Sequence, residues 1–206
     1  MMLFRSARIA TLVAMMICCG CGSSAPRASD EGVYEVGRLR ITLDGGWYKQ
    51  TRSDLPRAQA PSSTWSREGV EHDRLFVTGG VGDGEPVFKA SDYPGLPVFR
   101  PNMSATETAD FVAKSLQAVL WNGSASVAAS NARERGFTGL PGFEFELSAD
   151  VPGSASHRGI AGGFVDGGRL YLTVYLAESP GYFERHRQAA QAVIDSSVPT
   201  MKTIRW

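Results

Sequence analysis

Two segments near the end of the chain constrain the fold more than any other feature. Residues 160–165 and 169–176 are rich in apolar and aromatic side chains, and the turn sequence Asp166-Gly167-Gly168 separates them. A turn of this composition joins adjacent antiparallel strands, because glycine adopts the positive φ angles that a tight hairpin requires. The sequence therefore predicts a β-hairpin made of these two segments.

The second strand of this hairpin can be covered on both of its faces. Side chains alternate between the two faces of a strand, and here one face is aliphatic while the other carries tyrosine and threonine. This pattern favours a strand packed inside a sheet that lies between two layers. Alternatively, the tyrosine face lines a groove, where the rings provide contact area and the hydroxyls provide polarity. The aliphatic face holds Leu170, Leu172, Val174 and Leu176, and the other face holds Thr173 with Tyr171 and Tyr175, the candidate binding residues.

Two segments are predicted to be helices. The first begins at Ser104, which can form a capping box with Glu107, and it ends near Gly123. The second begins at Ser179 and Pro180, with the serine as N-cap and the proline at the first helical position. The predicted inner faces are Ala109, Val112, Leu116, Val119 and Leu120 in the first helix, and Phe183, Ala190, Val193 and Ile194 in the second.

The order of these elements indicates the fold class. Strands come first, then a helix, then more strands, and finally the second helix. Because hairpins join most neighbouring strands, we expect an α+β fold with a largely antiparallel sheet and helices packed on its faces. We expect residues 32–206 to form a single domain. Further strands are predicted at 32–36, 38–43, 73–78, 127–133 and 143–147, and loops at 52–63 and 93–101.

The first twenty residues have the features of a secretory signal peptide. Arg5 and Arg8 make the start positive, and residues 9–17 are almost wholly apolar. The apolar run is shorter than the roughly 20 residues that a membrane-spanning helix needs. We therefore predict that residues 1–20 are removed from the mature protein.

The three cysteines of the chain lie together at the end of this segment. A cysteine that follows a small residue at the end of an apolar run resembles the lipobox of bacterial lipoproteins, and here that residue is Cys21, preceded by Gly20. The resemblance implies cleavage between these two residues and acylation of Cys21, for example with palmitate, which anchors the protein to a membrane. Residues 21–31 would then form the lipidated end and a flexible tether.

Two features leave the modified position open. The lipobox usually has an aliphatic residue three positions before the cysteine, where this chain has Cys18. Cys19 is a poorer candidate than Cys21, because Ile17 and Cys18 precede it. A plain cleaved signal with a soluble periplasmic product is the alternative.

Charge and motif spacing exclude several classes of function. The chain has 21 basic and 21 acidic residues, whereas a nucleic-acid binder needs a basic surface. The glycine-rich run at 79–84 is followed by Glu85 and Pro86 rather than by the Lys-Ser/Thr pair of a phosphate loop. The adjacent donors at 71–73 point to opposite faces of a strand, which disfavours a metal site. We therefore expect no cofactor, no metal and no nucleic-acid partner.

The histidines are the candidates for acid–base catalysis. His157 follows Ser154 and Ser156, which are residue types of a nucleophilic site, but no orienting acid is recognisable nearby. His186 lies beside the apolar face of the second predicted helix and is expected to be a boundary residue. An envelope hydrolase that uses His157 or His72 stays an alternative, and it requires an acid and a nucleophile to meet that histidine in one pocket.

Several segments together resemble small bacterial lipoproteins of the PsbP-like type. They are ITLDGGW in the second predicted strand, MSATETADFVAKSL at the first helix, the strand GFEFEL, and the closing GGRLYLTVYLAESPGYFERHRQAAQAVIDS. The likeness spans most of residues 32–198 and implies a central antiparallel sheet with helices on both faces. This family includes photosystem assembly subunits, a Ran-binding relative and many envelope proteins, which implies binding rather than catalysis. No functional motif matches, so the resemblance assigns no residue a role.

These observations predict a non-catalytic binding or assembly module, anchored in the bacterial cell envelope and facing the periplasm. Its expected partners are the membrane, through the N-terminal lipid, and an envelope protein that the sequence does not identify. In enteric bacteria, aspartate after the lipidated cysteine implies retention in the inner membrane; Gly22 and Ser23 follow Cys21 here, which favours the outer membrane. The hydrolase and a carrier of a small apolar ligand, held between the sheet and a helix, are the alternatives.

Overall fold

A computed structural model describes residues 31–51, 53 and 55–200 of this chain. The predicted signal peptide, the cleavage site at Gly20 and the lipidation site at Cys21 lie outside the described residues. Among the described residues, no helix combines the length and the apolar character that crossing a membrane requires.

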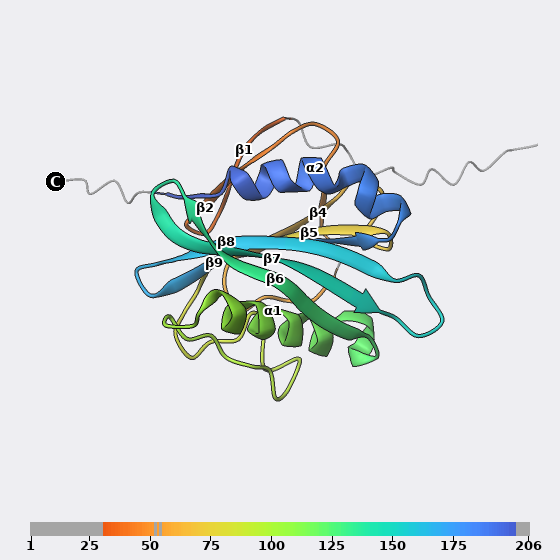
Figure 1. The fold of residues 1–206 in the computed structure, drawn as a ribbon, viewed down its shortest axis with the longest axis horizontal. Helices are drawn as coiled ribbons and strands as arrows, with labels where there is room; N and C mark the ends of the chain where they lie inside the picture. The colour runs from red at the N-terminus through yellow and green to blue at the C-terminus, as the bar shows by residue number, and fades with distance from the viewer. Residues whose placement is uncertain (1–30, 52, 54, 201–206) are drawn as a thin grey trace, which may run out of the picture.

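A seven-stranded sheet forms the centre of the domain (Figure 1). All neighbouring strands in it run antiparallel, so the predicted fold class is confirmed. The order across the sheet is β3 (Tyr48–Gln50), β4 (Ser62–Ser66), β5 (Asp73–Val81), β9 (Arg169–Glu178), β8 (His157–Asp166), β7 (Leu140–Asp150) and β6 (Ser126–Phe137).

One layer covers each face of this sheet. Helix α1 (Ala105–Val119), which continues into a short 3-10 turn η1 (Leu120–Gly123), packs on one face. Helix α2 (Gly181–Asp195) packs on the other face, as Figure 1 shows. Beside α2 lies a second sheet of β1 (Gly32–Val36), β2 (Leu39–Leu43) and β10 (Val198–Pro199). The sequence predicted both hairpin strands at the N-terminus, but not that they leave the central sheet and cover it.

The predicted C-terminal hairpin is present as β8 and β9. Asp166 pairs with Arg169, and both glycines of the turn have positive φ angles. The aliphatic face of β9 packs under α1, while its tyrosine face packs under α2. The alternation in this one strand therefore predicted a sheet with both faces covered.

One of the two predicted helix caps is present and the other is not. The Ser104 hydroxyl accepts a hydrogen bond from the Glu107 amide, and the Glu107 carboxylate accepts one from the Ser104 amide, so the capping box is confirmed. In α2, however, Pro180 rather than Ser179 occupies the N-cap position, and no side chain caps this helix. All the residues predicted for the two inner faces are buried.

The sequence missed part of the central sheet. Strand β4 begins inside the segment predicted as a loop, and β5 extends three residues past its predicted end into the glycine-rich run. Neither boundary has a local signal, because β4 has no alternating apolar pattern and glycine disfavours strands. Pairing with distant strands sets the start of β4 and the end of β5, since Ser62 pairs with Thr78 and Gly79 pairs with Tyr171.

Candidate functional site

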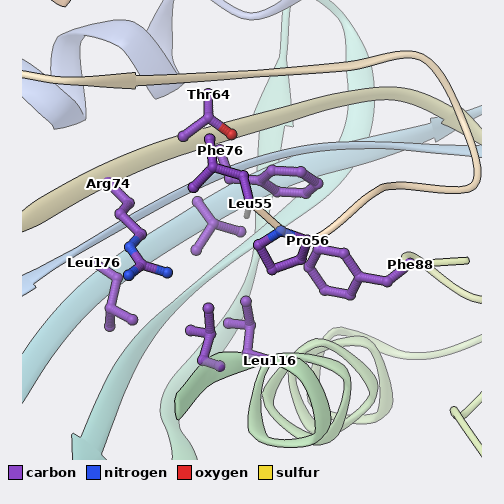
Figure 2. A pocket seen from close by; sticks show the side chains of 10 residues that line it. Leu55, Pro56, Thr64, Arg74, Phe76, Phe88, Leu116 and Leu176 are labelled. Atoms are coloured by element: carbon purple, nitrogen blue, oxygen red, sulfur yellow. The ribbon is translucent and has the colours of Figure 1, made fainter. Parts of the chain in front are cut away.

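A small pocket opens between the central sheet and α1, and Figure 2 shows its side chains. Seven of its ten lining residues are aliphatic or aromatic, one is proline and one is threonine. The tenth is Arg74, the charged residue among the described residues that line the pocket. We call it the apolar pocket. It is lined by Leu55, Pro56, Thr64, Arg74, Phe76, Phe88, Leu116, Leu120, Val174 and Leu176.

Strand register builds the floor of the apolar pocket. Thr64 on β4, Phe76 on β5 and Val174 on β9 are directly paired across three strands. Arg74 lies two residues before Phe76, on the same face, and it pairs with Leu176. Directly paired residues on one face of a sheet have Cβ atoms about 5 Å apart, so these side chains form a continuous floor.

Helix α1 and two loop segments build the walls. Leu116 and Leu120 come from the C-terminal end of α1. The ring of Phe88 lies 5.3 Å from that of Phe76 and closes one end of the pocket. The Gln59 amide donates to the Val87 carbonyl, which ties the loop before β4 to the segment around Phe88. Leu55 and Pro56 reach over the mouth from this loop (Figure 2).

The size of the apolar pocket limits what it can hold. Its cavity volume is about 40 Å³, which corresponds to about three water molecules at roughly 10–15 Å³ each. One small apolar group fits this space, whereas a long acyl chain does not. A larger hollow of about 470 Å³ lies beside the N-terminal end of α1, but it is wide open and mixes polar and apolar groups.

A second, smaller hollow adjoins the apolar pocket. Arg74 and Leu176 line both of them. We call it the histidine hollow, because His72 and His157 meet there although 85 positions separate them in the sequence. The structure therefore brings together two of the three histidines that the sequence analysis considered. The hollow is lined by Val70, Glu71, His72, Asp73, Arg74, Trp121, His157 and Leu176, a set without serine, threonine or cysteine.

His157 is held inside the domain, where burial disfavours its charged form. Its side chain is 6% exposed, its Nδ1–H donates to the Ala155 carbonyl at 3.0 Å, and its ring lies 4.7 Å from that of Trp121. Burial lowers the pKa of His157, and the positive charge of Arg74 lowers it further, while the Ala155 carbonyl and Glu178 act in the opposite direction.

This lowered pKa predicts a loss of stability in acid. The unfolded chain binds a proton at His157 more readily than the folded chain does. The folded state is therefore most stable, with respect to this residue, above about pH 6.5, and it loses stability as the pH falls below that value. We expect His157→Asn, which keeps a donor near the Ala155 carbonyl, to lose less stability than the wild type between pH 7.5 and 5.5. Urea unfolding at both pH values measures this. Equal losses in the two proteins would contradict it.

The other two histidines pair with glutamates near α2. His72 stacks on Tyr182 at 4.7 Å, and its Nδ1 lies 3.3 Å from Glu178 Oε2, a distance that suits an ion pair but lacks hydrogen-bond alignment. His186 Nε2 lies 2.8 Å from Glu68 Oε1, and this hydrogen bond lowers the pKa of Glu68. His186 is therefore a boundary residue of α2, outside both hollows.

The candidate binding face at Tyr171 and Tyr175 is corrected by the structure. These side chains are 1% and 0% exposed, because α2 and the β1–β2 hairpin cover them. Tyr175 meets Trp47 edge to face at 6.0 Å and stacks on Phe183 at 6.3 Å. Burial raises the pKa of Tyr175 strongly. The two tyrosines are packing residues of the core.

The apolar pocket was not predicted from the sequence, although one part of it has a local signal. In the predicted strand at 73–78, Arg74 and Phe76 alternate with Leu75 and Val77. This alternation could have placed Arg74 and Phe76 on one face of the strand. The remaining lining residues come from five other segments, and no local pattern brings them together.

Comparison with known structures identifies the architecture. The solution structure of cyanobacterial PsbP (CyanoP) from Synechocystis sp. PCC 6803 superposes with a TM-score of 0.55 and 15% sequence identity, covering 86% of this chain and 95% of that one. The fold is PsbP-like. This confirms the architecture that the sequence resemblance implied. Because the two sequences are only 15% identical, the similarity extends to the fold and not to function.

A second solved structure is less similar to this chain. A crystal structure from Bacteroides thetaiotaomicron matches with 9% identity and a TM-score of 0.46, over 86% of this chain and 52% of that chain. No family model and no curated protein sequence matches. Among the described residues, no group of three or more histidines and acids is placed to hold a metal ion.

Proposed function

We propose that this chain is a lipoprotein of the bacterial envelope whose PsbP-like domain is a non-catalytic binding module. Acylated Cys21 holds the domain at the periplasmic face of a membrane, and residues 22–31 serve as the tether. The domain binds an envelope protein by taking one of its apolar groups into the apolar pocket. The sequence of the leader supports the anchor, and the pocket supports the binding activity.

The apolar pocket is the observation that carries this proposal. It is preformed, its floor is fixed by strand pairing, and its lining is apolar except at Thr64 and Arg74. Such a pocket suits a small apolar anchor from a partner, and buried anchors of this kind supply most of the affinity in protein interfaces. Its volume of about 40 Å³ favours this function over a carrier of lipid-sized ligands.

The anchor is tested by replacing Cys21 with serine. A serine oxygen cannot form the thioether, so we expect the Cys21→Ser protein to leave the membrane fraction and to lack the mass of the acyl chains. Fractionation and intact-mass measurement check both. Cys19→Ser is the matched control and should behave as the wild type. If Cys19→Ser releases the protein and Cys21→Ser does not, the modified position is wrong.

The binding activity is tested by filling the pocket from β4. Thr64→Tyr places a ring in the pocket from a partly exposed strand position, whereas Ser62→Tyr places the same ring on the same face of β4, outside the pocket. We expect crosslinking in cells to recover one specific envelope protein with the wild type and with Ser62→Tyr, and at least tenfold less of it with Thr64→Tyr. Equal recovery from all three proteins would show that the pocket does not bind the partner.

A further inference from the structure

The turn η1 at the end of α1 has a strained backbone. Trp121 and Asn122 have φ angles of 49° and 54°, although neither residue is glycine. For a side chain as bulky as tryptophan this conformation is an outlier, and it persists only where surrounding contacts hold it in place. The contacts of Trp121 therefore decide whether this turn stays closed.

Two kinds of contact hold Trp121. Its carbonyl accepts a hydrogen bond from the Ser124 amide at 3.0 Å and another from the Ser124 hydroxyl at 2.6 Å. Its ring meets the ring of His157 edge to face, with the ring centres 4.7 Å apart. The hydrogen bonds are local to the turn, whereas the ring contact joins the turn to the first residue of β8. His157 therefore attaches η1 to the central sheet.

The surroundings of His157 leave little room to hydrate a charged imidazole. Glu178 pairs with it on β9, Ala149 pairs with it on β7, and η1 contributes no charged residue. The titratable or charged residues that line the histidine hollow beside it are Glu71, His72, Asp73 and Arg74. The cavity volume of this hollow is about 10 Å³, which is room for about one water molecule. A protonated His157 would therefore lie near the Arg74 guanidinium with almost no water.

From this geometry we infer that η1 is an acid-sensitive closure: protonation of His157 releases Trp121, the turn opens, and one wall of the apolar pocket moves away. Leu120, the residue before Trp121, lines the apolar pocket, and Arg74 and Leu176 line both the pocket and the histidine hollow. Opening the turn therefore joins the two spaces. The inference concerns the conformation of the domain, so it holds whether or not the pocket binds an envelope protein.

The direction of the pH effect follows from the change in burial. Burial in the closed turn lowers the pKa of His157, whereas the open turn exposes the imidazole and restores its ordinary pKa of about 6.5. The closed turn is therefore most stable above about pH 6.5 and loses stability as the pH falls below that value. Since opening is coupled to the uptake of one proton, the population of the open turn should rise by up to about tenfold between pH 7.5 and 5.5.

Amide hydrogen exchange at two positions in the mature full chain in detergent tests this inference. The Ser124 amide reports on the turn, and the Thr108 amide, which donates to the Ser104 carbonyl at 2.9 Å, reports on the opposite end of α1. Protection is measured relative to an unstructured peptide at the same pH. We expect the protection of Ser124 to fall by up to about tenfold between pH 7.5 and 5.5, while Thr108 keeps its protection. Equal losses at both positions would mean that the helix or the whole domain unfolds, which contradicts the inference.

Two variants identify the residue that takes up the proton. In His157→Asn the protection of Ser124 should be the same at both pH values, whatever its absolute size, because asparagine does not titrate. His72→Asn is the matched control: it removes the other histidine of the same hollow and should keep the pH dependence of the wild type. Persistence of the pH dependence in His157→Asn, or its loss in His72→Asn, would show that His157 is not the sensor.

An NMR titration of the wild type decides the same question if His157→Asn does not fold. The midpoint of the loss of protection at Ser124 should coincide with the protonation of His157. A midpoint that follows His72 or His186 instead would overturn the inference.

The dye anilinonaphthalene sulfonate, which becomes fluorescent on exposed apolar surface, tests the link to the apolar pocket. Its fluorescence should rise in parallel with the opening of the turn, by up to about tenfold between pH 7.5 and 5.5. Thr64→Tyr, which fills the pocket, should suppress most of this rise, and His157→Asn should abolish it. An equal rise in the wild type and in Thr64→Tyr would show that the pocket is not uncovered and that the inference is wrong, while the crosslinking comparison would still judge the proposed function.

Discussion

Gly79→Ala is expected to lower the free energy of unfolding by about 3 kcal/mol or more. A Cβ at Gly79 would lie 1.8 Å from the Val36 carbonyl oxygen and 3.3 Å from the Arg38 amide nitrogen. Both neighbours are backbone atoms of the turn between β1 and β2, so no side chain can rotate away to relieve the contact. The hairpin would have to lift from β5, which exposes the core that it covers.

Gly45→Ala is the matched control for this prediction. Its Cβ would meet no atom within 4 Å, so the same change should alter stability by less than about 0.5 kcal/mol. Urea unfolding followed by the fluorescence of the buried Trp47 and Trp65 compares the two variants with the wild type. A midpoint for Gly79→Ala that matches the wild type would show that the turn does not lie against β5.

Asp73→Ala is expected to lower the free energy of unfolding by about 3 kcal/mol or more, because alanine has no group that can accept the hydrogen bonds of the buried carboxylate. The side chain of Asp73 accepts from the Ser66 hydroxyl at 2.8 Å and from the amides of Arg67 at 3.0 Å and Glu68 at 2.8 Å. Removing it leaves three donors without their acceptor. It also frees the turn that carries Glu68, the partner of His186 on α2.

Asp83→Ala provides the comparison for this second variant. Asp83 is 61% exposed and pairs with Arg100 at 3.0 Å, and an exposed pair of this kind contributes between about 0 and 1 kcal/mol. The melting temperature of Asp73→Ala should therefore be clearly lower than that of Asp83→Ala. Similar melting temperatures for Asp73→Ala and Asp83→Ala would mean that the carboxylate of Asp73 is not holding the turn.

Asp73 also shows how the structure reassigns a sequence candidate. The sequence placed Glu71, His72 and Asp73 together as possible metal donors and predicted that they point apart. In the structure the carboxylate of Asp73 accepts from the turn between β4 and β5, while His72 stacks on Tyr182. The prediction relied on strand geometry, but β5 begins only at Asp73, so Glu71 and His72 lie in the turn before it, and all three residues line the histidine hollow. The hydrogen bonds that Asp73 accepts could not be read from the sequence. Its donors are backbone amides, which every sequence contains.

The elements that the sequence predicted well are those with local causes. The capping box at Ser104 and Glu107 involves residues three apart, and the turn at Gly167 and Gly168 needs only local backbone freedom. The inner faces of both helices follow from the helical period alone. Strand β4 and the end of β5 have no such local cause, and the prediction failed there.

The apolar pocket could be predicted only in part for the same reason. The alternation around Arg74 and Phe76 is a signal that could have put these residues on one face of a strand, but it does not show what lies opposite. Leu116 was predicted as a core residue of α1, which the structure confirms, and its buried side chain also lines the pocket. The histidine hollow is likewise a product of strand register, because His157 begins β8, His72 directly precedes β5, and the end of β9 lies between these two strands.

By itself, the sequence determined that this chain forms an α+β domain with a sheet covered on both faces, since hairpin turns, helix caps and alternating side chains act over a few residues. Only the tertiary structure decided that β1 and β2 leave the central sheet, that Tyr171 and Tyr175 are covered, and that Arg74 faces an apolar pocket. Each of these depends on contacts between residues that are distant in the chain. Such contacts are selected by the combined packing of all layers, and no local pattern encodes them.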